Sequence, residues 1–224
     1  MADLLEAIEV ETAPGPRAAV IWMHGLGADG HDFEPIVPEL GVPRIFPVRF
    51  VFPHAPMRPV TINAGMIMRA WYDVANERGA RREDEPGVRA SQQAIQALID
   101  REKQRGLLAG DIVLAGFSQG GAMALQTGLR HPERLAGLLV LSSFLPLAHL
   151  LAAEVSAANR DVPIFMAHGT HDPMIPLDRA RESRDRLLAL GYRVEWHEYP
   201  MPHAVSADEI RDVSAWLRRV LRLA

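Results

Sequence analysis

The chain contains 224 residues, of which 48% are hydrophobic and 23% charged, as in a globular protein with a sizeable core. Its formal net charge of −4 gives no electrostatic reason to expect a nucleic acid or an anionic membrane as a partner. The sequence contains no cysteine, which excludes disulfides, thiolate metal sites and a cysteine nucleophile. No apolar run reaches the roughly 18 residues needed to span a bilayer, and residues 1–12 are acidic where a signal peptide would be basic. We therefore expect a cytoplasmic protein without stable membrane insertion.

Apolar strands and amphipathic helices alternate along the chain. Strands are predicted over residues 18–23, 46–52, 112–115, 135–141, 163–167 and 193–199. Helices are predicted over residues 32–40, 86–105, 178–190 and 206–221, and directly after Ser118. Residues 53–86 show neither pattern and form a long loop, which in a compact domain is usually functional. The alternation predicts one α/β domain over residues 1–224, with a mostly parallel central sheet and helices on both faces.

The sequence from Gly116 to Gly120 is a G-x-S-x-G pattern between a predicted strand and a predicted helix. This context is typical of a nucleophile elbow, in which a sharp turn presents a serine above the start of a helix. Glycine is required at both ends because a Cβ there would clash where strand and helix approach each other. The helix N-terminus also directs backbone N–H groups toward an acyl group bound at Ser118. The alternative is a tight turn whose serine caps the helix.

A serine nucleophile needs a base, and the base needs an acid that orients it. In α/β-hydrolases the order along the chain is serine, acid, histidine, and open α/β sheets build their sites at the carboxyl ends of the strands. Asp172 is the first carboxylate after the strand at residues 163–167. Asp161 precedes that strand, at the wrong edge, and Asp178 is better explained as the N-cap of the next helix. The alternative for Asp172 is an Asx turn set up by Pro173.

Two histidines downstream of Asp172 are candidates for the base. His197 lies inside the alternating strand at residues 193–199, where its side chain should point to solvent on one face of the sheet. His203 lies beyond the carboxyl end of that strand and before the last helix. We therefore predict a triad of Ser118, Asp172 and His203, with a helix-entry histidine as the alternative for His203.

Acyl transfer also needs donors for the oxyanion of the tetrahedral intermediate. One donor is expected to be the backbone N–H of Gln119, the residue after the nucleophile. The second is expected from the glycine-containing loop at residues 24–27, which follows the first predicted strand. A glycine-rich loop after a strand also suits phosphate binding, but a G-x-G-x-x-G pattern and a P-loop lysine are both absent there.

Several separate motifs occur in the order found in one known family. On these motifs the chain resembles the carboxylesterase/acyl-protein thioesterase family of α/β-hydrolases, also called the phospholipase/carboxylesterase family, over nearly its whole length. The matching stretches are W-M-H-G-L-G-A-D from Trp22, F-P-H-A-P from Phe52, P-V-T-I-N from Pro59, A-W-Y-D from Ala70, G-F-S-Q-G-G-A from Gly116, H-G-T-H-D-P-M-I-P from His168 and Y-P-M-P-H from Tyr199.

The resemblance implies a single-domain α/β-hydrolase fold and the triad assigned above. It places the oxyanion hole at the backbone N–H groups of Leu26 and Gln119. It further implies a hydrolase of carboxylic and thio esters with little or no lid, commonly a homodimer and needing no cofactor. The charged stretch at residues 77–85 departs from the family's pattern in a variable region, so it leaves the acyl-chain preference open.

The long loop also carries apolar residues, among them Met66, Met68 and Trp71. Flexible thioethers suit a surface that accommodates several acyl chains, so these residues are predicted to bind substrate. The alternative is that they pack the loop onto the core. His168 and His171 lie close to Asp172, but no histidine–carboxylate cluster has the spacing of a zinc protease, so no metal site is expected.

The leading hypothesis is a serine hydrolase that cleaves small or medium acyl esters through an acyl-enzyme intermediate. Its partner would be a small-molecule ester or thioester. The same site would also serve an acyl-protein thioesterase or a lysophospholipase, and the sequence does not separate these substrates. The remaining alternative is a ligand-binding module without activity on the same fold.

Overall fold

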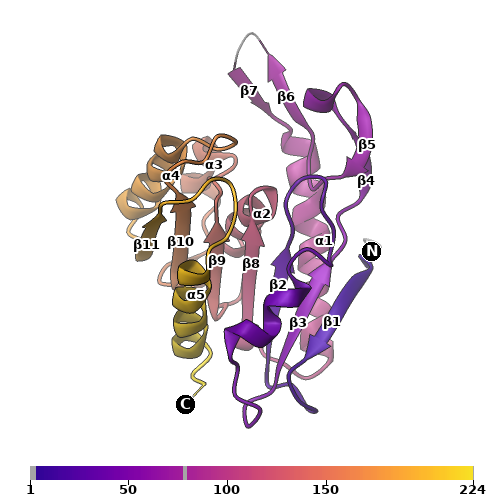
Figure 1. Ribbon diagram of the computed structural model, residues 1–224, viewed down its shortest axis with the longest axis vertical. Helices are drawn as coiled ribbons and strands as arrows, with labels where there is room; N and C mark the ends of the chain where they lie inside the picture. Colours follow the sequence, from indigo (N-terminus) through magenta and orange to yellow (C-terminus); the bar gives the residue numbers. More distant parts are fainter. Residues whose placement is uncertain (1–3, 78–79, 224) are drawn as a thin grey trace.

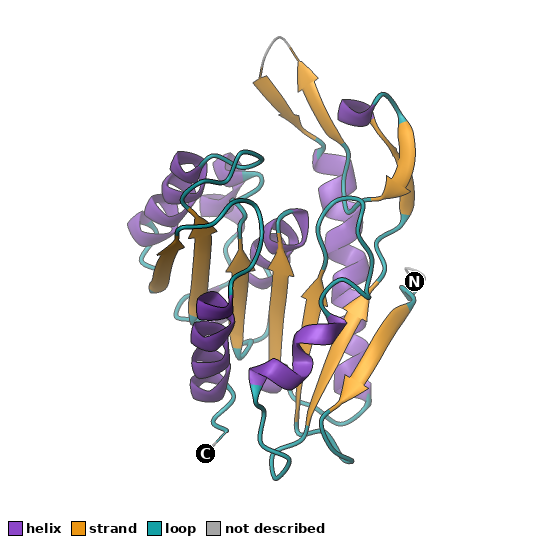
Figure 2. Cartoon of the chain, viewed as in Figure 1, coloured by secondary structure: helices purple, strands orange, loops and turns teal. Residues whose placement is uncertain are grey.

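In the computed structural model, a twisted sheet lies between two layers of helices (Figure 1, Figure 2). The structure describes residues 4–77 and 80–223. Within these residues the central sheet contains seven strands, in the spatial order β1 (Ala7–Glu11), β3 (Val48–Pro53), β2 (Ala18–Met23), β8 (Ile112–Phe117), β9 (Gly137–Leu141), β10 (Ile164–Gly169) and β11 (Val194–Tyr199). The edge strand β1 pairs antiparallel with β3, and the pairs from β3 to β11 are parallel. The predicted mostly parallel sheet is confirmed.

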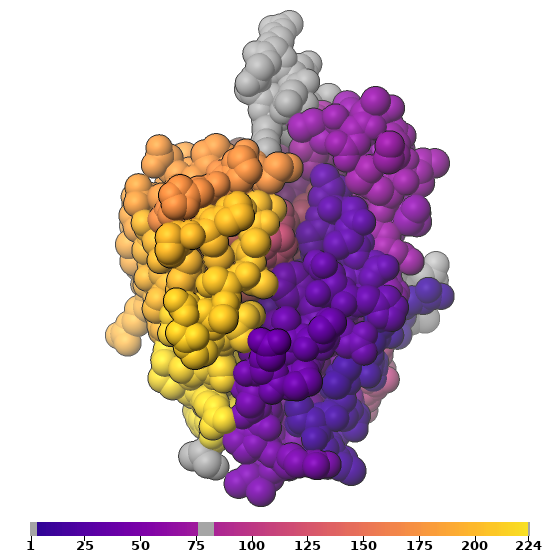
Figure 3. Space-filling model, in the orientation of Figure 1, coloured from indigo at the N-terminus to yellow at the C-terminus, as the bar shows by residue number. Residues whose placement is uncertain are grey.

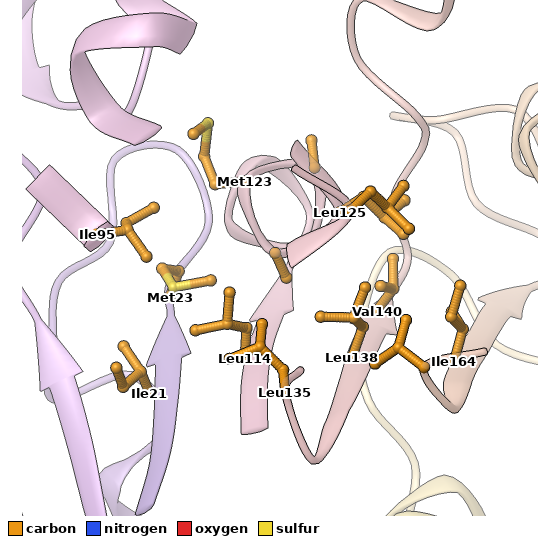
Figure 4. Packing of buried hydrophobic residues seen from close by; sticks show 14 of the residues in the cluster. Ile21, Met23, Ile95, Leu114, Met123, Leu125, Leu135, Leu138, Val140 and Ile164 are labelled. Atoms are coloured by element: carbon orange, nitrogen blue, oxygen red, sulfur yellow. The ribbon is translucent and has the colours of Figure 1, made fainter. Parts of the chain in front are cut away.

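Helices cover both faces of this sheet because successive side chains of its buried strands point to opposite sides. In β2, Ile21 and Met23 join the core that packs against α1 (Glu85–Gln104) and α2 (Gln119–Gly128). Val20 and Trp22 join the core that packs against α5 (Ala207–Val220) and the 3-10 helix η1 (Glu34–Leu40). Figure 4 shows Ile95 of α1 near Ile21 and Met23 in the first core. The helices are α1 (Glu85–Gln104), α2 (Gln119–Gly128), α3 (Ala148–Glu154), α4 (Leu177–Ala189) and α5 (Ala207–Val220), with short 3-10 turns η1 (Glu34–Leu40), η2 (Thr61–Asn63), η3 (Ala109–Asp111) and η4 (Ala157–Asn159).

The segment predicted as one irregular loop, residues 53–86, contains two hairpins. The first joins β4 (Met57–Val60) to β5 (Met66–Arg69), and the second joins β6 (Val74–Glu77) to β7 (Ala80–Glu83). Each is a two-stranded sheet, where the proline in β4 is tolerated and no alternating pattern is required. Thr61 fixes the first hairpin by donating from its backbone N–H and its hydroxyl to Asp73, at 2.7 and 2.6 Å. Residues 78–79 of the charged stretch lie outside the described residues.

Other predicted elements differ at their ends. The helix expected over residues 32–40 is the 3-10 helix η1, because prolines at two of its positions remove backbone donors. Asp178 is not an N-cap: α4 begins one residue before it, after Pro176, and Asp178 lies in the first turn, where its charge complements the helix dipole. Strand β1 and helix α3 were not predicted. Among the described residues, no helix combines the length and apolar character needed to cross a membrane.

Candidate active site

Ser118 stands in a strained turn between β8 and α2, at φ 55° and ψ −120°. A Cβ added to Gly116 would lie 2.2 Å from the carbonyl carbon of Gly120, and one added to Gly120 would lie 2.1 Å from the carbonyl oxygen of Met23. Both contacts are with backbone atoms that cannot move aside, so glycine is required at both positions. Within the described part of the chain, the Ser118 side chain makes no capping bond to α2. The alternative of a helix-capping serine is therefore not supported.

The three predicted triad residues come together at the carboxyl edge of the sheet. Ser118 follows β8, Asp172 follows β10 and His203 follows β11, and these strands end at the same side of the molecule (Figure 1). The Nε2 atom of His203 lies 2.9 Å from the Ser118 hydroxyl, and its Nδ1 atom lies 2.6 Å from Oδ2 of Asp172. These distances form one continuous hydrogen-bonded chain from acid to alcohol, so the imidazole can take a proton from Ser118.

The carboxylate of Asp172 is buried and uses both of its oxygens. While Oδ2 faces His203, Oδ1 accepts from the backbone N–H groups of Met174 and Ile175, at 2.8 and 2.9 Å. The Asx turn considered as an alternative for this residue is therefore present, and it coexists with the contact to the histidine. His168 also helps to hold the backbone of this turn in place. Its Nε2 donates to the Ile175 carbonyl at 2.8 Å and lies 3.3 Å from Oδ2 of Asp172.

The rejected histidine, His197, packs away from this chain of hydrogen bonds. Its ring stacks on Phe165 with centroids 4.8 Å apart, and its Nε2 lies 3.2 Å from Glu195. The ring is half-buried, with the rings of Phe165 and Tyr199 stacked beside it, so the expectation that it points to solvent holds only in part. The ring of His203 instead packs on Phe117, at 4.7 Å between centroids.

The loop expected to supply the second oxyanion donor passes beside the nucleophile. A Cβ added to Gly25 would lie 3.4 Å from the Cβ of Ser118. Leu26 and Gln119 both line the cavity that contains Ser118 and His203. Because Gln119 is the first residue of α2, its N–H has no acceptor within the helix and remains available to a ligand.

His24 holds the start of this loop as a neutral imidazole. Its Nε2 accepts from the backbone N–H of Ala55 at 3.0 Å, so the proton resides on Nδ1, which donates to the Gly25 carbonyl at 2.7 Å. Burial lowers the pKa of His24 to about 4, and the hydrogen bond with Gly25 opposes that shift. Protonation of Nε2 would break the bond from Ala55.

This lowered pKa predicts a stability loss in acid. The unfolded chain takes up a proton at His24 near pH 6.5 and the folded chain only near pH 4, so the free energy of unfolding falls as the pH drops between these values. From pH 7 to pH 5 the loss due to His24 is about 2 kcal/mol. Burial raises the pKa of Glu209 to about 8, which acts in the opposite direction.

Because these two contributions oppose each other, the test compares the pH dependence of stability in the wild type with that in a His24 variant. Urea unfolding at both pH values should show that His24→Gln loses less stability on acidification than the wild type. Glutamine can accept from Ala55 through its amide oxygen but does not titrate. Equal losses in the two proteins would show that His24 is not held neutral.

A cavity of about 370 Å³ adjoins Ser118 and His203. Figure 3 shows the purple residues of β4 and β5 at the upper right of the molecule and the orange residues of the C-terminal half at the upper left. Of the charged stretch at residues 77–85, Glu83 and Asp84 line the cavity. On another part of the wall, the guanidinium carbon of Arg179 lies 3.5 Å from the ring centroid of Phe144. Apolar and aromatic side chains form much of the wall, namely Ile62, Tyr72, Val88, Phe144, Met174 and Ile175.

The predicted substrate-binding residues occupy different places. Met66 is exposed on β5, and Met68 accepts a hydrogen bond from Asn63 through its sulfur at 3.3 Å. Trp71 is fully buried, so the alternative of packing onto the core holds for this residue. None of the three is among the residues that line the cavity beside Ser118. Sequence reasoning missed Phe144, which follows the predicted strand at residues 135–141 without any motif of its own.

Metal binding is not indicated by the described residues, since no three or more of their histidine and carboxylate side chains form a group that could hold an ion. The site is therefore a hydroxyl, an imidazole and a carboxylate beside an apolar cavity, which is the arrangement of a serine hydrolase.

Comparison with known proteins agrees with this geometry. A family model described as Phospholipase/Carboxylesterase matches residues 6–221. The chain belongs to this family. Two relatives are named acyl-protein thioesterase 1. The Gibberella zeae protein is 40% identical over 91% of both chains. The Yarrowia lipolytica protein is 35% identical over 96% of this chain and 97% of its own.

Solved structures of similar proteins share the fold of this family member. Arabidopsis thaliana SOBER1 has a TM-score of 0.84 at 31% identity, with 92% of this chain and 99% of the other covered. Zea mays acyl-protein thioesterase 2 also has a TM-score of 0.84, at 26% identity over 96% and 99% of the two chains. The α/β-hydrolase fold is confirmed, and the protein is a serine hydrolase of ester or thioester bonds.

Proposed function

We propose that this protein is a carboxylesterase that cleaves small or medium acyl esters through an acyl-enzyme intermediate on Ser118. The observation that carries the proposal is the hydrogen-bonded chain from Asp172 through His203 to the Ser118 hydroxyl, at 2.6 and 2.9 Å, beside an apolar cavity. The carboxylate can orient the imidazole, the imidazole can accept a proton, and the hydroxyl can then attack as the nucleophile. No cofactor takes part in this mechanism.

In the proposed reaction, Ser118 Oγ attacks the ester carbonyl while Nε2 of His203 takes its proton. Asp172 keeps the other imidazole proton on Nδ1 and stabilises the imidazolium. The backbone N–H groups of Leu26 and Gln119 bind the oxyanion of the tetrahedral intermediate. His203 then protonates the departing alcohol, and a water molecule activated by the same imidazole hydrolyses the acyl-enzyme.

A second candidate is an acyl-protein thioesterase, which the names of the relatives favour. The same site would attack a thioester, with a thiol as the leaving group, and a lysophospholipase would also use it. The apolar wall that includes Ile62 and Met174 suits an acyl chain. Values of kcat/KM for short acyl esters, long acyl thioesters and a lysophospholipid decide among the three substrate classes.

Loss of the nucleophile tests the proposal itself. Wild-type protein should react covalently with a fluorophosphonate probe and hydrolyse a p-nitrophenyl ester, and Ser118→Ala should lose both properties. Ser142→Ala, which removes another buried hydroxyl near the sheet edge, is the control and should keep both. A wild-type protein that neither reacts with the probe nor hydrolyses any member of the panel would favour a ligand-binding module.

Cytoplasmic residence and a homodimer remain part of the proposal. The absence of cysteine is compatible with a reducing compartment, and family resemblance supports the dimer.

A further inference from the structure

Trp71 occupies a central position between the two backbone segments that border the nucleophile. It lies between β5 and β6, its side chain is fully buried, and its ring packs against that of His24 with centroids 5.4 Å apart. The hydroxyl of Ser91 on α1 donates to its carbonyl oxygen. Trp71 is thus bound to α1 through its carbonyl oxygen, while its ring contacts the loop that begins at His24.

The first loop is held on both sides of Leu26. The indole N–H of Trp71 donates to the carbonyl oxygen of His24 at 2.9 Å, two residues before Leu26. The carbonyl oxygen of Arg69 accepts from the backbone N–H of Gly27 at 2.9 Å, one residue after it. Both anchors belong to residues 69–72, so this short segment sets the orientation of the peptide groups on either side of Leu26.

The second backbone segment, at the start of α2, is held through the side chain of Gln119. Its Oε1 accepts from the backbone N–H of Trp71 at 2.7 Å, and its Nε2 donates to the carbonyl oxygen of Tyr72 at 2.7 Å. A backbone N–H can only donate and a carbonyl oxygen can only accept, so this pair fixes the amide orientation. The residue that starts α2 is thereby tied to the same segment as the first loop.

We propose that Trp71 is a positioning residue that holds the backbone N–H groups of Leu26 and Gln119 at the separation needed to bind an oxyanion. This inference rests on the proposed function. Stabilisation of an oxyanion depends on donors that are already in place when charge develops, because reorganising them would cost the energy that they supply. The indole N–H of Trp71 binds the loop that carries Leu26, and the backbone N–H of Trp71 binds the side chain of Gln119. Trp71 is not among the residues that line the cavity beside Ser118.

The test is Trp71→Phe, which keeps an aromatic ring and removes the indole N–H. Trp196→Phe is the matched control, because the indole N–H of Trp196 also donates at 2.9 Å, to Glu198, on the edge strand β11, which β9 and β10 separate from β8. For Trp71→Phe we expect kcat for a p-nitrophenyl ester to fall by about 10- to 100-fold. This is less than the roughly 100- to 1000-fold loss seen when an oxyanion donor itself is removed, because the variant displaces the donors but keeps them. KM should change little, because substrate in its ground state does not yet carry the charge.

A second readout separates positioning from simple folding. An alkyl boronic acid forms a tetrahedral adduct with the serine and places an oxygen where the oxyanion develops, so its Ki should rise by the same factor as kcat falls. Trp196→Phe should keep the wild-type kcat and Ki. If Trp71→Phe does not fold, Gln119→Met tests the same connection from the other loop, and the same changes in kcat and Ki are expected.

Unchanged kcat and boronate affinity in folded Trp71→Phe, with the wild type active and Ser118→Ala inactive, would overturn the positioning role and leave the proposed function standing. A rise in KM without a fall in kcat would overturn it as well, since that result indicates substrate contact. An inactive wild type that does not react with a fluorophosphonate would overturn the proposed function first.

Discussion

Replacing His203 by alanine should lower kcat by at least about 10⁴-fold, because no other group then accepts the proton of the Ser118 hydroxyl. The imidazole lies 2.9 Å from that hydroxyl and is positioned by Phe117 and Asp172. An ester hydrolysis assay at saturating substrate measures the loss. Unfolding temperatures show whether the variant is folded.

His197→Ala is the matched control for this experiment. It removes a second half-buried imidazole that, like His203, packs against a phenylalanine and contacts a carboxylate. Its loss should cost about 1 kcal/mol of stability through the stacking on Phe165, with kcat/KM close to that of the wild type. Equal losses of turnover in both variants would mean that His203 is not the base.

Asp172→Asn should lower kcat by about 10⁴-fold and leave KM little changed. Oδ1 of Asp172 accepts from two backbone N–H groups, so an asparagine should keep its oxygen there and turn its NH₂ group toward His203. An NH₂ group cannot accept from Nδ1, and the imidazole must then carry its proton on Nε2. In that tautomer Nε2 donates to the serine hydroxyl and cannot take its proton.

The control for this variant is Asp178→Asn, on the exposed first turn of α4, which should leave kcat unchanged. Because asparagine preserves the turn, the unfolding temperature of Asp172→Asn should stay close to the wild-type value, which separates a tautomer effect from a folding defect. Full activity in Asp172→Asn would assign the acid to another carboxylate.

The sequence was sufficient for the residues whose place follows from chain order. Strands with carboxyl ends at one edge of a parallel sheet bring Ser118, Asp172 and His203 to that edge, and the structure has them in contact. The same reasoning separated His203 from His197, because one lies beyond its strand and the other within it.

The place of Trp71 and the two hairpins depend on tertiary packing, which the local sequence does not show. Trp71 was expected to bind substrate because the sequence does not show that its segment folds back between two loops, where the indole is buried and donates to His24. The hairpins at residues 57–83 also depend on non-local contacts, such as the bonds from Thr61 to Asp73. Short two-stranded ribbons carry no periodic apolar pattern, and so local sequence reasoning assigned them to a loop.

In the proposed mechanism, the two hydrogen-bonding sides of the Asp172 carboxylate make catalysis depend on the integrity of one short backbone segment. The oxygen that closes the turn at Met174 and the oxygen that orients His203 belong to a single rigid group. Any local opening that frees the peptide groups of residues 174–175 also releases the acid from its alignment, so no partly open form of this loop can remain fully active. Enzyme activity in mild denaturant therefore reports on the closed population of this loop rather than on the whole molecule.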